Sequence, residues 1–181
     1  MQPFATAAQA WAALEAQRGT TDGETLDLWQ HALQTAEGLA ARGADAELVV
    51  AGLLHDLGDG RVSGADHAPW AADLVRPLLG ARVAWLIGAH AEAKRYLCTT
   101  DPAYTDGLST VSRRTLIEQG GLMTADEATR FAAHPWAEAA VLLRHCDDAG
   151  KRPDDQVADP ERFRARLVAL AAAHTRNGED A

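Results

Sequence analysis

The sequence predicts an all-α fold, a single bundle of about eight helices. Alanine and leucine dominate the chain, β-branched residues are sparse, and apolar positions recur at intervals of three and four residues, as on amphipathic helices. A chain of 181 residues that is 47% hydrophobic can build one substantial core and is too short for two ordinary domains. We therefore expect one domain over residues 1–181.

Cap and stop residues delimit the helices of the N-terminal part. Gly43 supplies a left-handed stop, and Asp45 can cap the helix that follows. That helix carries an apolar run into His55-Asp56 and stops in the turn Gly58-Asp59-Gly60. The expected helices of this part cover about residues 4–18, 24–42 and from 46 to that turn.

The C-terminal part is divided in the same way. Asp101–Gly107 is rich in turn-forming residues and is expected to be a connection. Thr124 and Glu127 form a capping box, and Pro135 stands at a first-turn position. The polar tail Arg176–Ala181 is expected to fray. The expected helices of this part lie near residues 67–79, 82–97, 109–119, from 124, 135–148 and from 159.

Charge and cysteine usage exclude several classes of partner. The chain has 26 acidic and 17 basic residues, and its net charge of -9 repels a nucleic-acid backbone. Cys98 and Cys146 fit no metal spacing and no disulfide framework, and the N-terminus lacks a signal-peptide pattern, so we expect a reduced cytoplasm. The longest apolar runs, such as Leu48–Leu54, are far shorter than the roughly 20 residues that span a bilayer, which predicts no membrane insertion.

The adjacent pair His55-Asp56 is the first sign of a metal site. It follows the apolar stretch Val49–Leu54 at the C-terminal end of a helix. Adjacent helical residues point about 100° apart, so the imidazole and the carboxylate can coordinate a metal from two sides. The second carboxylate oxygen can then bind another ion. The dipeptide alone arises by chance in many chains, so it needs support from its neighbours.

Four further residues give that support. His31 lies one helix earlier, and His67 follows His55 by twelve residues. His90 stands in an apolar helix, and Asp147 completes the set. Instead of binding a metal, His31 could pack between helices, and His67 could be exposed to solvent. Nitrogen and oxygen donors of this kind suit iron, manganese or zinc, and six ligands are too many for one catalytic ion, so we expect two ions that share one carboxylate.

A longer pattern around these residues is more specific than the dipeptide. Its strongest parts are the block Ala93–Leu97 after His90 and the triplet Gln119-Gly120-Gly121. With them, the stretch from about Gly23 to Lys151 resembles the HD-domain mixed-valent diiron oxygenases. This group includes myo-inositol oxygenase and, closer to this sequence, the 2-amino-1-hydroxyethylphosphonate dioxygenases, which cleave a carbon–phosphorus bond. The other matching stretches are Glu24, His31–Gln34, Leu53–Asp56, Asp101–Tyr104, Arg144, Asp147-Asp148 and Lys151.

The resemblance implies a pair of iron ions, Fe(II) and Fe(III), with dioxygen as co-substrate, and with Asp56 as the bridge. The family usually places an acidic residue directly after the histidine that corresponds to His67, whereas Ala68 follows here. Asp148 is the rival of Asp147, which we prefer because it stands four residues before a lysine, as the ligand of the family does. One iron would be held by His31, His55, Asp56 and Asp147, and the other by Asp56, His67 and His90.

Basic side chains near these ligands predict a small anionic substrate. Lys94 lies four residues after His90, on the same helical face, so its ammonium would meet an anionic group bound beside the metals. Arg144 could bind the same anion, or it could form a salt bridge with one of the two aspartates that follow it. Asp56 and Lys94 are the candidate catalytic residues.

Two more substrate contacts are implied by the resemblance, and two positions depart from it. Ser112 would hydrogen-bond the phosphonate, and Glu24 would receive the amino group of the substrate; the plain alternatives are a cap or surface hydroxyl and a carboxylate that stabilises a helix N-terminus. Thr21 stands where the family has a tyrosine, and Asp59 where it has a histidine that touches the phosphonate. Because a carboxylate repels a dianion, either Asp59 turns away or the substrate differs.

The leading hypothesis is a diiron oxygenase that converts a 1-hydroxyalkylphosphonate to a carboxylic acid and phosphate. The substrate would be 2-amino- or trimethylammonio-1-hydroxyethylphosphonate, or hydroxymethylphosphonate. The alternative is an HD-domain phosphohydrolase, in which the metals activate water against a nucleotide or another phosphate ester. A regulatory module without turnover is a third option, and the intact set of six ligands argues against it. The oligomeric state is left open.

Overall fold

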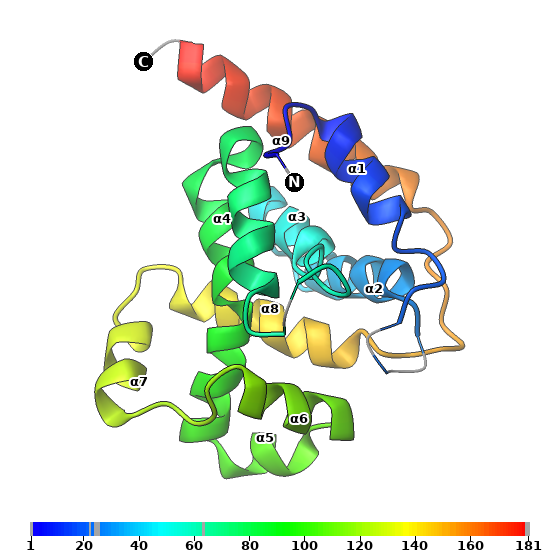
Figure 1. Ribbon diagram of the computed structural model, residues 1–181. Helices are drawn as coiled ribbons and strands as arrows, with labels where there is room; N and C mark the ends of the chain where they lie inside the picture. Colours follow the sequence, from blue (N-terminus) through cyan, green and yellow to red (C-terminus); the bar gives the residue numbers. More distant parts are fainter. Residues whose placement is uncertain (1, 22, 24–25, 63, 180–181) are drawn as a thin grey trace.

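The computed structural model describes residues 2–21, 23, 26–62 and 64–179, and these form helices and no strand. The all-α prediction is therefore confirmed. Figure 1 shows the arrangement of the helices in space. They are α1 (Ala7–Glu15), α2 (Leu28–Ala41), α3 (Ala46–Leu54), α4 (His67–Thr100), α5 (Pro102–Gly107), α6 (Thr110–Glu118), α7 (Ala125–Ala132), α8 (Ala137–Ala149) and α9 (Glu161–Glu179).

The centre of the molecule is α3, the most apolar helix. All residues from Leu48 to Leu54 are buried, so this helix has no solvent-facing side beyond its first turn. A helix that is apolar all round is stable only when other elements cover it on every side. Four helices do so, namely α2, α4, α8 and α9. The C-terminal end of α3 therefore delivers His55 and Asp56 into the interior.

A kink divides α4 into the two helices that the sequence predicted. Gly80 has φ 84° and ψ 179°, a conformation that is readily accessible only to glycine. A Cβ atom at this position would also lie 2.9 Å from Cε1 of His174 in α9. The kink redirects the second half of α4, which carries His90 and Lys94, along α8 toward α5 and α6.

Two boundaries differ from the prediction. Asp101–Gly107 was expected to be a connection, but Pro102–Gly107 is helix α5, because Pro102 fits a first helical turn and the Asp101 side chain accepts a hydrogen bond from the Ala103 N–H. The second helix begins at Leu28 and not at Glu24, since Asp27 is its N-cap. The last helix extends through Arg176 to Glu179, into the tail for which the sequence predicts fraying.

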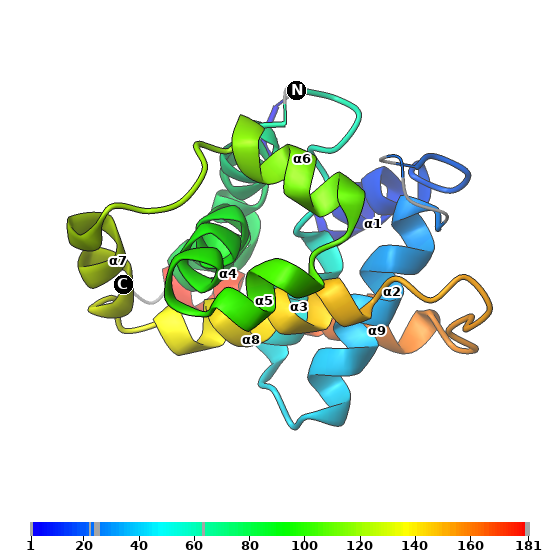
Figure 2. The same cartoon turned by 90° about the horizontal axis from the view of Figure 1, so that it is seen from below.

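The short helices α5, α6 and α7 gather around the second half of α4. Seen from below in Figure 2, α5 and α6 lie toward the viewer, in front of the central helices. Residues 55–62 and 64–66 connect α3 to α4 as a series of turns. Among the described residues, no helix is both long enough and apolar enough to cross a membrane.

Candidate metal centre

Four buried histidines face one another in two pairs. The Nε2 atoms of His31 and His55 lie 3.3 Å apart, and those of His67 and His90 lie 2.9 Å apart. The rings come from α2, the end of α3, the start of α4 and the middle of α4. The structure thus brings together all four histidines that the sequence singled out.

Each of these rings is oriented by a backbone carbonyl. A carbonyl oxygen only accepts, so each Nδ1 donates, and the Nε2 atom of a neutral ring then carries a lone pair. Two lone pairs that face each other repel unless a proton or a cation lies between them. A ring fixed through one nitrogen with the other nitrogen free is the usual state of a metal-bound histidine. The distances are 2.9 Å from His31 to Gly150, 2.8 Å from His55 to Gly52, 2.6 Å from His67 to Gly64 and 2.7 Å from His90 to Ile87.

Asp56 turns one oxygen to each pair of rings. Its Oδ2 lies 3.0 Å from Nε2 of His55 and 3.3 Å from Nε2 of His31. Its Oδ1 lies 3.4 Å from Nε2 of His90 and 3.7 Å from Nε2 of His67. This is the arrangement of a carboxylate that can bridge two cations, one beside each histidine pair.

The backbone at Asp56 is held by Gln17, a residue for which the sequence predicted no role. The side-chain amide of Gln17, which is buried, donates a hydrogen bond of 2.7 Å to the Asp56 carbonyl. Gln17 follows α1, so this bond ties the N-terminal helix to the centre of the site.

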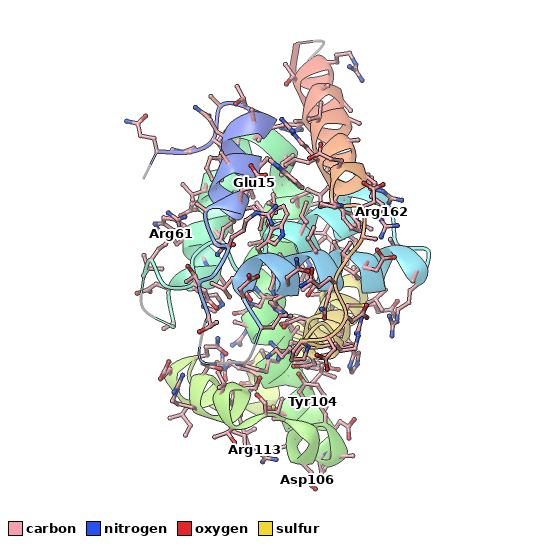
Figure 3. All side chains as sticks on the ribbon, turned by 90° about the vertical axis from the view of Figure 1, so that its right-hand side faces the viewer. Glu15, Arg61, Tyr104, Asp106, Arg113 and Arg162 are labelled. Carbon is pink, nitrogen blue, oxygen red and sulfur yellow. The ribbon has the colours of Figure 1, made fainter. Side chains whose placement is uncertain are left out.

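The two neighbouring aspartates of α8 point to different places. Asp147 is buried and its Oδ1 lies 3.2 Å from Nε2 of His31. Asp148, one residue on, is more exposed and accepts a 2.6 Å hydrogen bond from the hydroxyl of Tyr104. Tyr104 belongs to α5 and is labelled in Figure 3. Arg144 pairs with both carboxylates, and its Nη1 lies 2.7 Å from Oδ2 of Asp147. The salt bridge that the sequence left as an alternative for Arg144 is therefore present.

The protonation states of the cluster suit cations. Burial favours the neutral acid, but the charge of His55 holds the pKa of Asp56 well below its usual range, and Arg144 does the same for Asp147. Burial lowers the pKa of His90 to about 3, so this ring is neutral. His31 is buried too, but its hydrogen bonds to Asp147 and Asp56 raise its pKa to about 10, so a bound cation would replace a proton on this ring. Ionised carboxylates and neutral imidazoles are the forms in which these side chains bind metals. The residues present therefore fit a dinuclear metal site.

A small cavity of about 50 Å³ adjoins this cluster and is rich in cationic groups. Burial, followed by the charge of Arg144, lowers the pKa of Lys94 to about 8. The Lys94 ammonium donates a 2.8 Å hydrogen bond to Thr115, and that of Lys151 a 3.3 Å hydrogen bond to Ser112. The walls are formed by Asp56, Asp59, Gly64, His67, His90, Lys94, Val111, Ser112, Thr115, Gln119, Arg144, Asp147 and Lys151.

Residues 28–129 match the protein family described as "HD domain". The chain belongs to the HD-domain family. The match includes His31, the His55-Asp56 pair, His67 and His90, and it ends before Asp147. The HD pair of this family is thus the pair at the centre of the site.

Two relatives of this HD domain are phosphonate dioxygenases by name. The hydroxymethylphosphonate dioxygenase of Gimesia maris is 34% identical over 155 residues, which cover 80% of this chain and 77% of the relative. The glycine-betaine-forming [1-hydroxy-2-(trimethylamino)ethyl]phosphonate dioxygenase of Leisingera caerulea is 32% identical over 162 residues, 84% of this chain and 83% of the relative. The resemblance to the HD-domain oxygenases is confirmed.

Some residues that line the cavity of this HD domain were predicted from the sequence, and others were not. Lys94, Ser112 and Arg144 line it, whereas Glu24 lies outside the described residues. Thr115 and Gln119 also line it, although neither was assigned a role. They follow Ser112 by three and seven residues, which places all three on one face of α6.

The two departures from the family pattern differ in their placement. Asp59 is one of the residues that line the cavity. Thr21 is exposed on the surface. Of the two, Asp59 is therefore the position at which the chain changes the chemistry of the cavity.

Proposed function

We propose that this HD domain is a diiron oxygenase that cleaves the carbon–phosphorus bond of a 1-hydroxyalkylphosphonate. One molecule of dioxygen is consumed, and the products are a carboxylate and phosphate, which together contain both of its oxygen atoms. The observation that carries the proposal is Asp56, which turns one oxygen to each of two histidine pairs beside a cavity that Lys94 and Arg144 line. The names of the two relatives support the same reaction class. We further propose a single domain that works in the cytoplasm.

The ligand assignment follows from the two histidine pairs. His31, His55 and Asp147 would hold one iron, and His67 and His90 the other, with Asp56 shared. When bound, an Fe(II)/Fe(III) pair supplies the activation of dioxygen and the one-electron steps of the oxidation. The contribution of the protein is to hold the two ions and to orient the substrate beside them.

The cationic side chains of the cavity would bind the phosphonate. Lys94 and Arg144 supply charge, and Ser112 supplies a hydroxyl group, all within the same small space. Hydrogen bonds between ionised partners are short and strong, so these contacts fix the carbinol carbon relative to the metals. Glu24 keeps the role implied by the resemblance, as a receiver of the amino group of a substrate.

A test must separate this reaction from hydrolysis, which the same metals could support. Protein loaded with iron under a reductant should consume dioxygen and release phosphate from hydroxymethylphosphonate in equal amounts. Under strict anaerobiosis phosphate release should stop. Release that continues without dioxygen, or rapid turnover of nucleotides or phosphate monoesters, would instead establish the phosphohydrolase.

A further inference from the structure

We propose that Gln34 is a positioning residue for the metal site. By holding the loop after α8 against α2, it fixes the backbone carbonyl that orients the His31 ring, and it thereby sets the affinity for one of the two ions. The inference rests on the proposed function for the assignment of ligands to the two ions. It gives a role to a residue of the stretch His31–Gln34, which contains only one of the proposed ligands.

The ring of His31 is oriented in a different way from the other three rings of the cluster. His55, His67 and His90 each donate their Nδ1 hydrogen to a carbonyl three residues earlier in the chain, so local backbone structure is sufficient to orient them. His31 donates to the carbonyl of Gly150, which lies 119 positions away in the chain. The orientation of His31 therefore depends on how the segment around Gly150 is held against α2.

Gly150 lies very close to α2. A Cβ atom at this position would lie 2.8 Å from Oγ1 and 3.1 Å from the backbone nitrogen of Thr35. Glycine permits such a close approach of the backbone, and a larger residue would force the loop or α2 to shift. The Gly150 N–H also donates a 3.0 Å hydrogen bond to the carbonyl of Asp147, which is proposed to bind the same ion as His31. The loop after α8 is thus packed directly beside two ligands of one ion.

Gln34 holds this loop through three hydrogen bonds. Its side-chain amide donates to the carbonyls of Arg152, at 2.7 Å, and Asp155. Its side-chain oxygen accepts a 3.0 Å hydrogen bond from the Arg152 N–H. Both donors of the amide group and its carbonyl oxygen are therefore used. The residue is only 1% exposed, so water does not compete for these bonds.

The loop has few other means of keeping its place. Residues 150–160 form no helix, and Figure 1 shows them in orange as the connection between α8 and α9 at the edge of the molecule. Arg152 and Asp155 are exposed, so their side chains contribute no buried packing. Backbone groups outside regular secondary structure need partners from side chains or water. The amide of Gln34 provides such partners for this loop.

These contacts connect Gln34 to the metal site without any direct contact to the ions. If the amide is removed, the backbone groups of Arg152 and Asp155 can bind water instead, and the loop is no longer held to α2. Gly150, two residues before Arg152, then loses its fixed place beside His31. The groups that orient a metal-bound histidine contribute strongly to metal affinity, so the ion beside His31 should bind less tightly.

The expected effect is confined to one ion, and two variants of the article's ligand scheme isolate each ion. His67→Ala should keep only the ion beside His31, and His31→Ala only the ion beside His67. Gln34→Met is close to glutamine in size and removes all three hydrogen bonds. Added to His67→Ala, it should weaken Fe(II) binding about tenfold, as for the loss of a group that orients a ligand. Added to His31→Ala, it should change Fe(II) binding by less than about twofold, because the remaining ion shares no contact with the loop.

The measurement is anaerobic titration of the metal-free full-length proteins with Fe(II), followed by calorimetry. Circular dichroism and thermal unfolding of the metal-free proteins establish that each variant is folded. Gln30→Met is the matched control, the same substitution on α2 at a side chain whose oxygen has no hydrogen-bond partner among the described residues. It should change neither affinity by more than about twofold.

A second variant tests the same contact from the side of the loop. Gly150→Ala adds one methyl group that would meet Thr35, so it should displace the Gly150 carbonyl from His31 and weaken the same ion. This variant leaves the core of α2 intact, and it decides the question if Gln34→Met does not fold.

The contrary outcomes are distinct. Equal weakening of Fe(II) binding in the two backgrounds, or none in the His67→Ala background, would overturn the role of Gln34. A wild-type protein that binds two Fe(II) ions but oxidises no phosphonate would overturn the proposed oxygenase, while selective weakening by Gln34→Met would still support the positioning role. A wild-type protein that binds no Fe(II) would overturn both.

Discussion

Nε2 of His67 lies 2.9 Å from Nε2 of His90, although each ring already donates its Nδ1 hydrogen to a carbonyl, of Gly64 and Ile87 respectively. With the pKa of His90 lowered to about 3, this ring brings no proton of its own to the contact. If the two Nε2 atoms instead bind the same cation, their lone pairs point to the cation, and the repulsion between the rings is removed. The pair of His31 and His55 differs, because hydrogen bonds to Asp147 and Asp56 outweigh burial and raise the pKa of His31 to about 10, so a proton lies where a cation would bind.

The two histidine pairs should lose their metals separately. His67→Ala should lower the iron content from two ions to one per chain, and so should His31→Ala, because each removes a ligand from a different ion. Asp56→Ala should lose both ions and should also lower the melting temperature, since metal bound to the folded state stabilises it. Elemental analysis and thermal unfolding measure these changes; a wild-type content of one ion would contradict the scheme.

Lys94 is expected to bind substrate and not metal. Lys94→Ala should retain both ions and lose about tenfold to a hundredfold in kcat/KM, because a contact to a charged group contributes roughly 1.5–3 kcal/mol. Steady-state kinetics with parallel metal analysis provides the check. Wild-type kinetics in this variant would show that the phosphonate binds elsewhere.

The lowered pKa of Lys94 predicts a pH dependence. Below about pH 8 the amine is protonated and can hold an anion, and above that pH it loses its charge, so kcat/KM should fall on the alkaline side with a pKa near 8. Burial lowers this pKa most, Arg144 and Lys151 lower it further, and Asp147 and Asp148 raise it. Lys94→Arg should shift the alkaline limb out of the measured range, because arginine stays charged. An unchanged limb in Lys94→Arg would assign it to another group.

Asp147 and Asp148 should respond differently to the same change. Asp147→Asn should weaken metal binding, since this carboxylate faces His31. Asp148→Asn should leave the iron content unchanged and cost about 1–3 kcal/mol of stability, because it loosens the contacts to Tyr104 and Arg144. Metal loss in the second variant with none in the first would reverse the assignment.

The kink of α4 provides a prediction about the fold alone. Gly80→Ala should destabilise the protein by about 1–3 kcal/mol, because alanine is strained at a positive φ and its Cβ would meet His174. Gly88→Ala is the matched control in the same helix: its Cβ would make an ordinary 3.5 Å contact with Ala72, and the change should be neutral or stabilising. Denaturant unfolding of both variants measures the difference.

The sequence could predict the cluster of histidines and aspartates because parts of it stand in recognisable local contexts. An apolar helix runs directly into His55-Asp56, and the pattern around His90 extends to Lys94. Helix α5 was missed because Asp101 and Pro102 are as typical of turns as of a helix start, and only the capping contact to the Ala103 N–H distinguishes the two.

The walls of the cavity were harder to predict, for a physical reason. In the sequence, Thr115 and Gln119 look like polar residues of a solvent-exposed helix. Their spacing from Ser112 indicates a shared wall of the cavity only when the packing of α6 against α4 is known. The ion pairs of Arg144 with the aspartates of α8 are local and were foreseen as an alternative. The position of Asp59 depends on the loop between α3 and α4, where no periodicity guides the prediction.

The most direct test of the central claim, two iron ions that share Asp56, is electron paramagnetic resonance of the iron-loaded protein after partial oxidation. An antiferromagnetically coupled Fe(II)/Fe(III) pair has one net unpaired spin, so wild type should give the signal of a coupled pair at two irons per chain, and Asp56→Ala should not. A signal from isolated ferric ions alone, at one iron per chain, would contradict the account.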